Sequence, residues 1–251
     1  MNGAWLIARD EWRLWGRSRL AVAGLTVFVL LLTTTALFTA ARTTAEAHKR
    51  AHHQTEANQR FAEQPARHPH RMVHYGHYVF RPPAPLATFD PGVDAMTGES
   101  IFLEGHRQND ATFADDGAGV NIDAFGHLTP ALLYQIFLPL LLIALGHGVI
   151  LREHEAGTLT TILAQGTSVG VLVLGKSLAL LGIVILFMIP AIATVAFAAF
   201  SGASVAASAA LMLTYLAYFF IWTGIVVAVS LLCLERGLTL GILLLAWLTL
   251  T

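Results

Sequence analysis

The chain has 251 residues, of which 55% are hydrophobic and only 12% are charged, and its formal net charge is −1. Soluble domains carry about 25% charged residues, so this composition argues against a soluble globular protein and for a membrane protein. A single cysteine, Cys233, excludes an intrachain disulfide. The apolar residues gather in uncharged runs of 22 to 25 residues. At about 1.5 Å per helical residue, each run exceeds the roughly 30 Å hydrocarbon core of a bilayer.

These runs predict four membrane-spanning helices, and the segments between them differ in character. The predicted order is an interfacial N-terminal helix at 1–19, spans at 20–41, 128–151, 177–200 and 210–234, an extracytoplasmic domain at 42–127, a cytoplasmic loop at 152–176 and the start of a fifth span at 237–251. The last run is too short to cross a bilayer, so we expect the sequence to be truncated there. The first run is too long for the apolar core of a cleaved signal peptide and predicts an anchor.

The N-terminal segment is rich in tryptophan and arginine. At about 100° per residue, Trp5, Trp12 and Trp15 fall on one helical face. Tryptophan at headgroup depth beside arginine is typical of a helix that lies in the membrane interface. The alternative is an ordinary juxtamembrane helix in the cytoplasm.

Lysine and arginine in the short flanking segments indicate the orientation of the spans. Basic residues occur before the first span, in the loop at 152–176 and after the fourth span. Placing all of them in the cytoplasm puts the N-terminus inside and residues 42–127 outside. The segment 42–127 is also basic in part, but long loops translocate largely regardless of charge. The expected topology is therefore that of a multi-pass membrane protein with a cytoplasmic N-terminus.

The stretch GVLVLGKS, residues 170–177, fits the phosphate-loop pattern G-x-x-x-x-G-K-[ST]. Such a loop follows a buried strand and needs tight, positive-φ turns, whereas the variable positions here are valine and leucine and a span follows. The overlapping GTSVG around Ser168 fits the nucleophile-elbow pattern, but no histidine follows it. We therefore predict neither nucleotide binding nor catalysis by this chain. Lys176 is expected to reach lipid phosphates at the membrane interface.

The loop containing these patterns begins with charge and continues with apolar residues at helical spacing. It reads REHEAGTLTTILAQGTSVGVLVLGKSLA and resembles the cytoplasmic loop of ABC-2 type transporter permeases. Residues 74–109, HYGHYVFRPPAPLATFDPGVDAMTGESIFLEGHRQN, are similar to the extracytoplasmic region of NosY-like permeases and a related branch with a domain of unknown function. The resemblance implies an all-α polytopic membrane protein. Its expected form is an ABC-2 (type V ABC) permease-like helical bundle with an extracytoplasmic insertion between the first two spans.

By this resemblance, the loop is a coupling helix that seats in a groove of a separate ATPase. The positions that match the family pattern are Glu153, Glu155, Gly157, Thr158 and Leu159. The implied partners are a cytosolic ABC ATPase dimer, which would hold ATP and Mg²⁺, a second permease subunit of the same or another kind, membrane lipid and a periplasmic protein. Neither a cofactor in this chain nor a nucleic-acid partner is expected. An ordinary solvated loop is the alternative for this segment.

Nine of the eleven histidines lie within 42–127. His48 and His52 are four residues apart on a helix that is expected to extend the first span up to Pro65, and His74 and His77 follow. Imidazole suits copper, zinc, iron or nickel, but no cysteine accompanies these residues and their spacing matches no closed site. We therefore assign no metal site and keep these four histidines as candidates.

Two functions remain open from the sequence. The leading hypothesis is the permease subunit of an ABC-2 transporter, which moves a substrate across the inner membrane while a separate subunit hydrolyses ATP. The alternative is a membrane-anchored extracytoplasmic binding or assembly protein that does not transport and that captures a metal or a protein partner.

Overall fold

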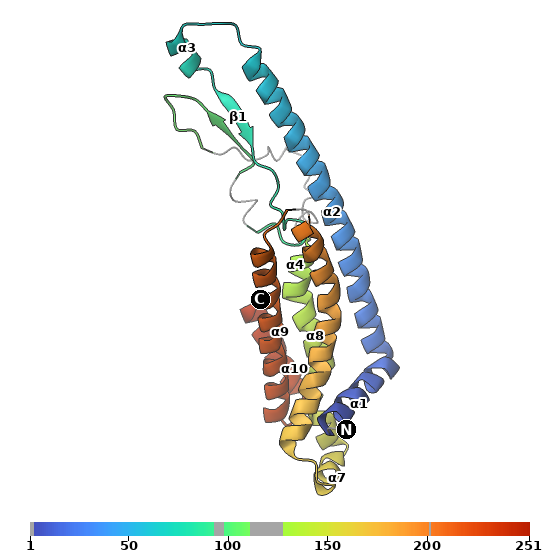
Figure 1. Cartoon of the computed structure of the whole chain (residues 1–251). Coiled ribbons are helices and arrows are strands. Elements are labelled where there is room, and N and C mark those ends of the chain that lie inside the picture. The colour runs from blue at the N-terminus through green and yellow to red at the C-terminus, as the bar shows by residue number, and fades with distance from the viewer. Residues whose placement is uncertain (1–2, 93–97, 111–127, 201) are drawn as a thin grey trace. The chain divides into compact units, whose positions relative to one another are not determined.

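The computed structural model describes residues 3–92, 98–110, 128–200 and 202–251 (Figure 1). The chain divides into two compact units, which are described separately. The first comprises Met1–Thr34, Ala131–Phe197 and Ser204–Thr251, and the second comprises Thr35–Pro130 and Ala198–Ala203.

The described elements are mostly helices. The helices are α1 (Gly3–Arg17), α2 (Arg19–Ala62), α3 (Pro69–Val73), α4 (Pro130–Leu132), the π-helix η3 (Leu133–Phe137), α5 (Leu138–Gly146), α6 (Leu151–Glu155), α7 (Thr158–Ala164), α8 (Val169–Phe200), α9 (Val205–Leu232) and α10 (Arg236–Leu250). The strands are β1 (His77–Phe80) and β2 (Ser100–Leu103), which form an antiparallel hairpin in the second unit.

Four helical segments among the described residues are long and apolar enough to cross a membrane. They are Arg19–Ala62, Pro130–Glu155, Val169–Phe200 and Val205–Leu232. They confirm the predicted all-α polytopic fold. The shorter apolar helix α10 follows the fourth of them. Helix α8 begins at Val169 rather than at the predicted 177, because a buried Lys176 does not mark the end of an apolar helix. Helix α9 begins at Val205 rather than at the predicted 210, after Ser204, whose side chain caps the helix by accepting from the N–H of Ala207.

Helix α2 continues the first predicted span without a break. Its 44 residues correspond to about 66 Å, roughly twice the hydrocarbon thickness. Beyond the apolar half, intrahelical pairs such as Arg42–Glu46, at 2.8 Å, support a polar helix. The helix ends at Ala62, before Pro65, because proline disfavours helical geometry in the residue that precedes it. The predicted extracytoplasmic domain, 42–127, lies in part outside the described residues.

The second span contains the π-helix η3 directly before Pro139. Proline has no backbone N–H, so the carbonyl of Gln135 lacks its usual helical donor. The hydroxyl of Tyr218 in α9 donates to this carbonyl at 2.8 Å, and the indole of Trp247 in α10 donates to the carbonyl of Ile136 at 2.9 Å. Hydrocarbon offers no water to such groups, so these bonds stabilise the irregular turn and join α9 and α10 to the span.

An aromatic cluster forms the centre of the first unit. Tyr134 is fully buried, and its ring lies 6.3 Å from Phe28 of α2 and 6.1 Å from Tyr215 of α9. Phe28 also meets Phe187 of α8 edge-on at 4.8 Å. Because aromatic side chains bury large areas, this cluster holds α2, η3, α8 and α9 around one core.

In the second unit, the C-terminal half of α2 supports the hairpin (Figure 1). The side-chain amide of Gln54 accepts from the N–H of Phe80 at 2.7 Å and donates to the carbonyl of Tyr78 at 3.2 Å, which completes the edge of β1. Arg50 is buried and donates to Glu99 at 2.7 Å. The polar part of α2 is therefore the scaffold on which the hairpin folds.

Candidate functional site

Helix α1 packs through a stripe of residues that recur every three or four positions. The buried residues of this helix are Ala4, Ala8, Glu11 and Trp15. The predicted face carried Trp5 and Trp12 beside Trp15. The structure adds an acidic residue, Glu11, at the centre of the buried stripe, with Trp15 buried and Trp5 54% exposed, and the interfacial position of these tryptophans stays a prediction.

Helix α1 packs closely on α8 at positions where α8 has small residues. A Cβ atom at Gly175 would lie 2.7 Å from the carbonyl oxygen of Ala4, and one at Gly182 would lie 2.1 Å from the ring of Trp12. The Trp12 indole also donates to the carbonyl of Ala179 at 2.9 Å. Close approach of helices over glycine and alanine is typical of membrane proteins. Gly175, which completes the phosphate-loop pattern in the sequence, therefore makes room for α1.

The GVLVLGKS stretch is helical throughout. Residues 170–177 lie inside α8, and none of the left-handed glycines of the described chain falls among them. A phosphate-binding nest is built from turns that include such left-handed residues. The stretch therefore lacks the geometry of a phosphate loop, and Gly170 and Gly175 continue the helix.

Four charged side chains meet where α1, α6 and α8 come together, and we call them the buried ion cluster: Glu11, Arg152, Glu153 and Lys176. The Lys176 ammonium lies 2.5 Å from Glu11 and 2.7 Å from Glu153. Arg152 lies 2.5 Å from the other oxygen of Glu11. The side chains of Glu11 and Lys176 are each only 2% exposed. Buried charges are tolerated when they are paired, so the formally neutral cluster ties the three helices together.

The position of Lys176 therefore differs from the prediction that its side chain reaches lipid phosphates at the membrane interface. Its ammonium does not extend towards lipid headgroups but is enclosed by carboxylates from segments 165 and 23 residues away. The cause is the close packing of α1 on Gly175, which brings Glu11 over the lysine.

The loop between spans two and three turns sharply at a glycine. Helix α6 ends at Glu155, α7 begins at Thr158, and Gly157 between them has a φ of 68°. A left-handed conformation costs other residues about 1–2 kcal/mol, which explains glycine at this corner. The Thr158 hydroxyl donates to the carboxylate of Glu153 at 2.7 Å and closes the corner.

A second ion pair connects the same loop to the start of α10. Glu155 lies 2.5 Å from Arg236 at the start of α10, and both side chains are partly exposed. Exposed pairs contribute little stability on their own. With the buried ion cluster, however, the pair attaches α6 to three other helices, through Arg152 to α1, through Glu153 to α8 and through Glu155 to α10.

Helix α7 presents an accessible surface. It has no fully buried residue: Leu159, Ile162 and Leu163 are half-buried, whereas Thr158, Thr160 and Thr161 are exposed. Of the predicted coupling positions, Glu153 and Glu155 point to the bundle through ion pairs, and Gly157, Thr158 and Leu159 shape the corner and the start of α7.

The four candidate metal-binding histidines do not come together in the described part of the chain. His48 is exposed on α2, and the ring of His77 packs against Phe61 at 5.0 Å. His52 and His74 each lie in a separate group of possible ligands.

Sequence reasoning did not single out Glu11 or Arg236. The sequence held one indication that Glu11 is buried: it is an acidic residue on the same helical stripe as Ala4, Ala8 and Trp15. Its partner, Lys176, lies 165 residues away and only the fold identifies it.

The four apolar helices, with their shared core and amphipathic connecting loop, define a helical membrane protein with several spans. The profile of the ABC-2 family transporter proteins matches residues 5–247, and the chain belongs to this family. Comparison with curated proteins and with solved structures gives no significant match.

Proposed function

We propose that the chain is the membrane-spanning permease subunit of an ABC-2 transporter and that a separate ATPase subunit drives its movement. The observation that supports this best is the exposed helix α7, held on a stiff corner and attached to the bundle by ion pairs. Family membership supports the transporter class. The long apolar cores of the spans, whose charged residues in the buried ion cluster lie near helix ends, fit a protein whose energy comes from a partner.

In this proposal, α7 is the coupling helix. Closing of an ATPase dimer on ATP pushes on its exposed face, and Gly157 and Glu153 pass the displacement to the bundle. The Glu153–Lys176 contact leads into α8, and the Glu155–Arg236 contact leads into α10. Packed helices respond to such a push as rigid bodies, so a small shift at the loop becomes a movement of whole spans.

The proposal also assigns surroundings and partners. The loop with α7 faces the cytoplasm and residues 42–127 lie outside a bacterial inner membrane, in the NosY-like branch or its relatives. Two permease subunits pair on two ATPases, and exposed apolar side chains of α2, α8 and α9 face lipid or the second subunit. ATP and Mg²⁺ belong to the ATPase, and this chain contributes no catalytic group.

A substitution on α7 tests this proposal. The full chain carrying Thr161→Arg should lose co-purification with the ATPase from its native membranes, because a bulky cation replaces an exposed contact residue. The control, Asp10→Lys, changes charge on an exposed part of α1 and should retain the ATPase. Glu155→Lys is less informative because it also breaks the pair with Arg236. Retention of the ATPase by Thr161→Arg would argue against docking at α7.

The alternative, an extracytoplasmic binding protein without transport, has one observation in its favour, which is the gathering of histidines in the second unit. It predicts that the wild-type chain purifies without any ATPase. The same experiment therefore separates the two functions.

A further inference from the structure

Three histidine rings meet at one end of the hairpin in the second unit, and we call them the histidine triad: His70, His74 and His106. Their ring centroids lie 5.2 Å apart for His70 and His74, 4.9 Å for His74 and His106, and 6.0 Å for His70 and His106. One nitrogen from each ring lies within 4.8 Å of the other two. All three side chains are exposed, so an ion has open access to them.

The positions of two elements explain why two of these residues meet. His74 is the C-cap of α3, three residues before β1, and His106 lies three residues after β2, in the short turn closed by the Glu104–Arg107 bridge. Because His77 and Leu103 form the last pair of the ladder, both histidines lie beyond the same end of the hairpin. His70 precedes His74 by one helical turn at the end of α3, so its ring lies on the same side.

A glycine fixes this arrangement. The N–H of Gly105 donates to the carbonyl of Val73 at 2.9 Å. A Cβ atom at Gly105 would lie 2.1 Å from the Val73 side chain and 3.0 Å from the Val73 carbonyl oxygen. Only glycine allows this approach. It holds Val73 and Gly105, the residues that precede His74 and His106, in contact. The triad is therefore positioned by backbone contacts and not by chance rotamers alone.

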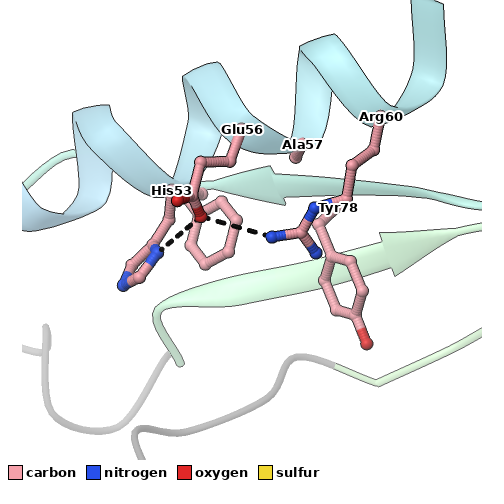
Figure 2. Close-up of a pocket in the computed structure, with 6 residues that line it drawn as sticks. His53, Glu56, Ala57, Arg60 and Tyr78 are labelled. Carbon is pink, nitrogen blue, oxygen red and sulfur yellow. Dashed lines mark hydrogen bonds and ion pairs between the residues drawn. The ribbon is translucent and has the colours of Figure 1, made fainter. Parts of the chain in front are cut away.

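A second group of possible ligands, His52, His53 and Glu56, differs in a decisive way. Two of its members, His53 and Glu56, line a cavity of about 170 Å³ between α2 and β1, shown in Figure 2. There the Glu56 carboxylate already pairs with the Arg60 guanidinium at 3.2 Å and with His53 at 3.5 Å. The arginine supplies the positive charge that a metal would bring. Within the described residues, the rings of the triad have no such cation or carboxylate partner.

We propose that His70, His74 and His106 bind one divalent transition-metal ion of the zinc and copper group, with a fourth position open to water or to a further ligand. Three neutral imidazoles suit zinc and copper, while magnesium and calcium prefer oxygen ligands. Zinc–nitrogen bonds of about 2.0–2.1 Å place tetrahedral ligands roughly 3.3 Å apart. Exposed rings reach that spacing from the present one by side-chain rotation. Copper(II) binds more tightly than zinc(II), following the general order of divalent metals.

The test uses the full chain in detergent, purified through a tag without histidine. Zinc is titrated in competition with a chromophoric chelator, copper(II) is followed by electron paramagnetic resonance, and magnesium serves as the negative control. The expected result is one zinc or copper ion per chain, with nitrogen coupling in the copper spectrum. His74→Ala and His106→Ala should each weaken binding by at least about tenfold, because loss of an outer-shell contact alone costs about that much.

Matched variants separate the triad from other histidines. His48→Ala and His52→Ala remove exposed histidines outside the triad and should leave binding unchanged. Gly105→Ala keeps all three ligands but displaces their backbone, so it should weaken binding. The proposal is overturned if the wild-type chain binds no stoichiometric zinc or copper, if affinity is unchanged in His74→Ala and His106→Ala, or if His52→Ala abolishes binding. These outcomes do not depend on ATPase docking at α7.

Discussion

At the scale of single residues, Glu11 gives the N-terminal helix its place. A carboxylate that is 2% exposed needs cations beside it, and Lys176 and Arg152 supply them. Lys176 in turn depends on Glu11 and Glu153. Each charge of the buried ion cluster is therefore stabilised by the others. This pairing gives Lys176 a structural role, although the sequence around it matches a nucleotide-binding pattern.

Removing the cation from this cluster should be costly. Lys176→Met keeps the length of the side chain but leaves Glu11 and Glu153 close together with only Arg152 beside them. Breaking a buried pair in this way costs about 3–5 kcal/mol. We expect a clear fall in the thermal unfolding temperature of the detergent-solubilised chain.

Two controls interpret that result. Arg13→Gln removes a partner of the exposed Asp10 and should have little effect. Lys176→Met combined with Glu11→Gln replaces charges on both sides, so it should be less destabilising than the sum of the single changes. An unfolding temperature of Lys176→Met equal to that of the wild type would contradict burial of the lysine.

At the scale of elements, the seat of α1 on α8 depends on glycine. In a helix that has free space, replacing glycine with alanine stabilises by about 0.5–1 kcal/mol. Gly224 in α9 has no neighbour within 4 Å of an added Cβ, whereas Gly175 has the Ala4 carbonyl oxygen at 2.7 Å. The same substitution should therefore have opposite effects at these two positions.

Hydrogen exchange measures this difference directly. Gly175→Ala should raise amide exchange in residues 3–17, because α1 is lifted from its seat. Gly224→Ala should leave exchange there at the wild-type level. If both variants protect α1 equally, then close packing at Gly175 is not what holds the helix.

The boundaries of the elements show which parts of the fold could be predicted from the sequence. Uninterrupted apolar runs were sufficient to predict the four spans and their order, since spans are fixed by length and polarity alone. The helical continuation of the first span up to the region of Pro65 also followed from local propensity. The start of α8 at Val169 did not, because Lys176 reads as a boundary until its partners are known.

The candidate sites were predictable only in part. The family resemblance singled out Glu153, Glu155 and Gly157 in the loop. Glu11 and Arg236 were missed, because ion pairs between distant segments leave no local pattern. The histidine triad was also missed, since His74 and His106 meet only because β1 pairs with β2, which their spacing in the sequence does not encode.

At the scale of the whole molecule, the proposed function requires that a partner acts on α7 and that the bundle receives the force through the ion pairs of α6. α7 is exposed and short, and it stands on a corner closed by Gly157 and Thr158. Its connections to α8 and α10 run through Glu153 and Glu155.

Site-specific photo-crosslinking tests this claim most directly. A photoreactive amino acid at Thr161, exposed on α7, is compared with the same group at Gln59, exposed on α2, in native membranes. We predict an adduct with an ABC ATPase from Thr161, whose yield changes between ATP and ADP, and no such adduct from Gln59. Absence of an ATPase adduct at Thr161, or an equal adduct at Gln59, would contradict the account.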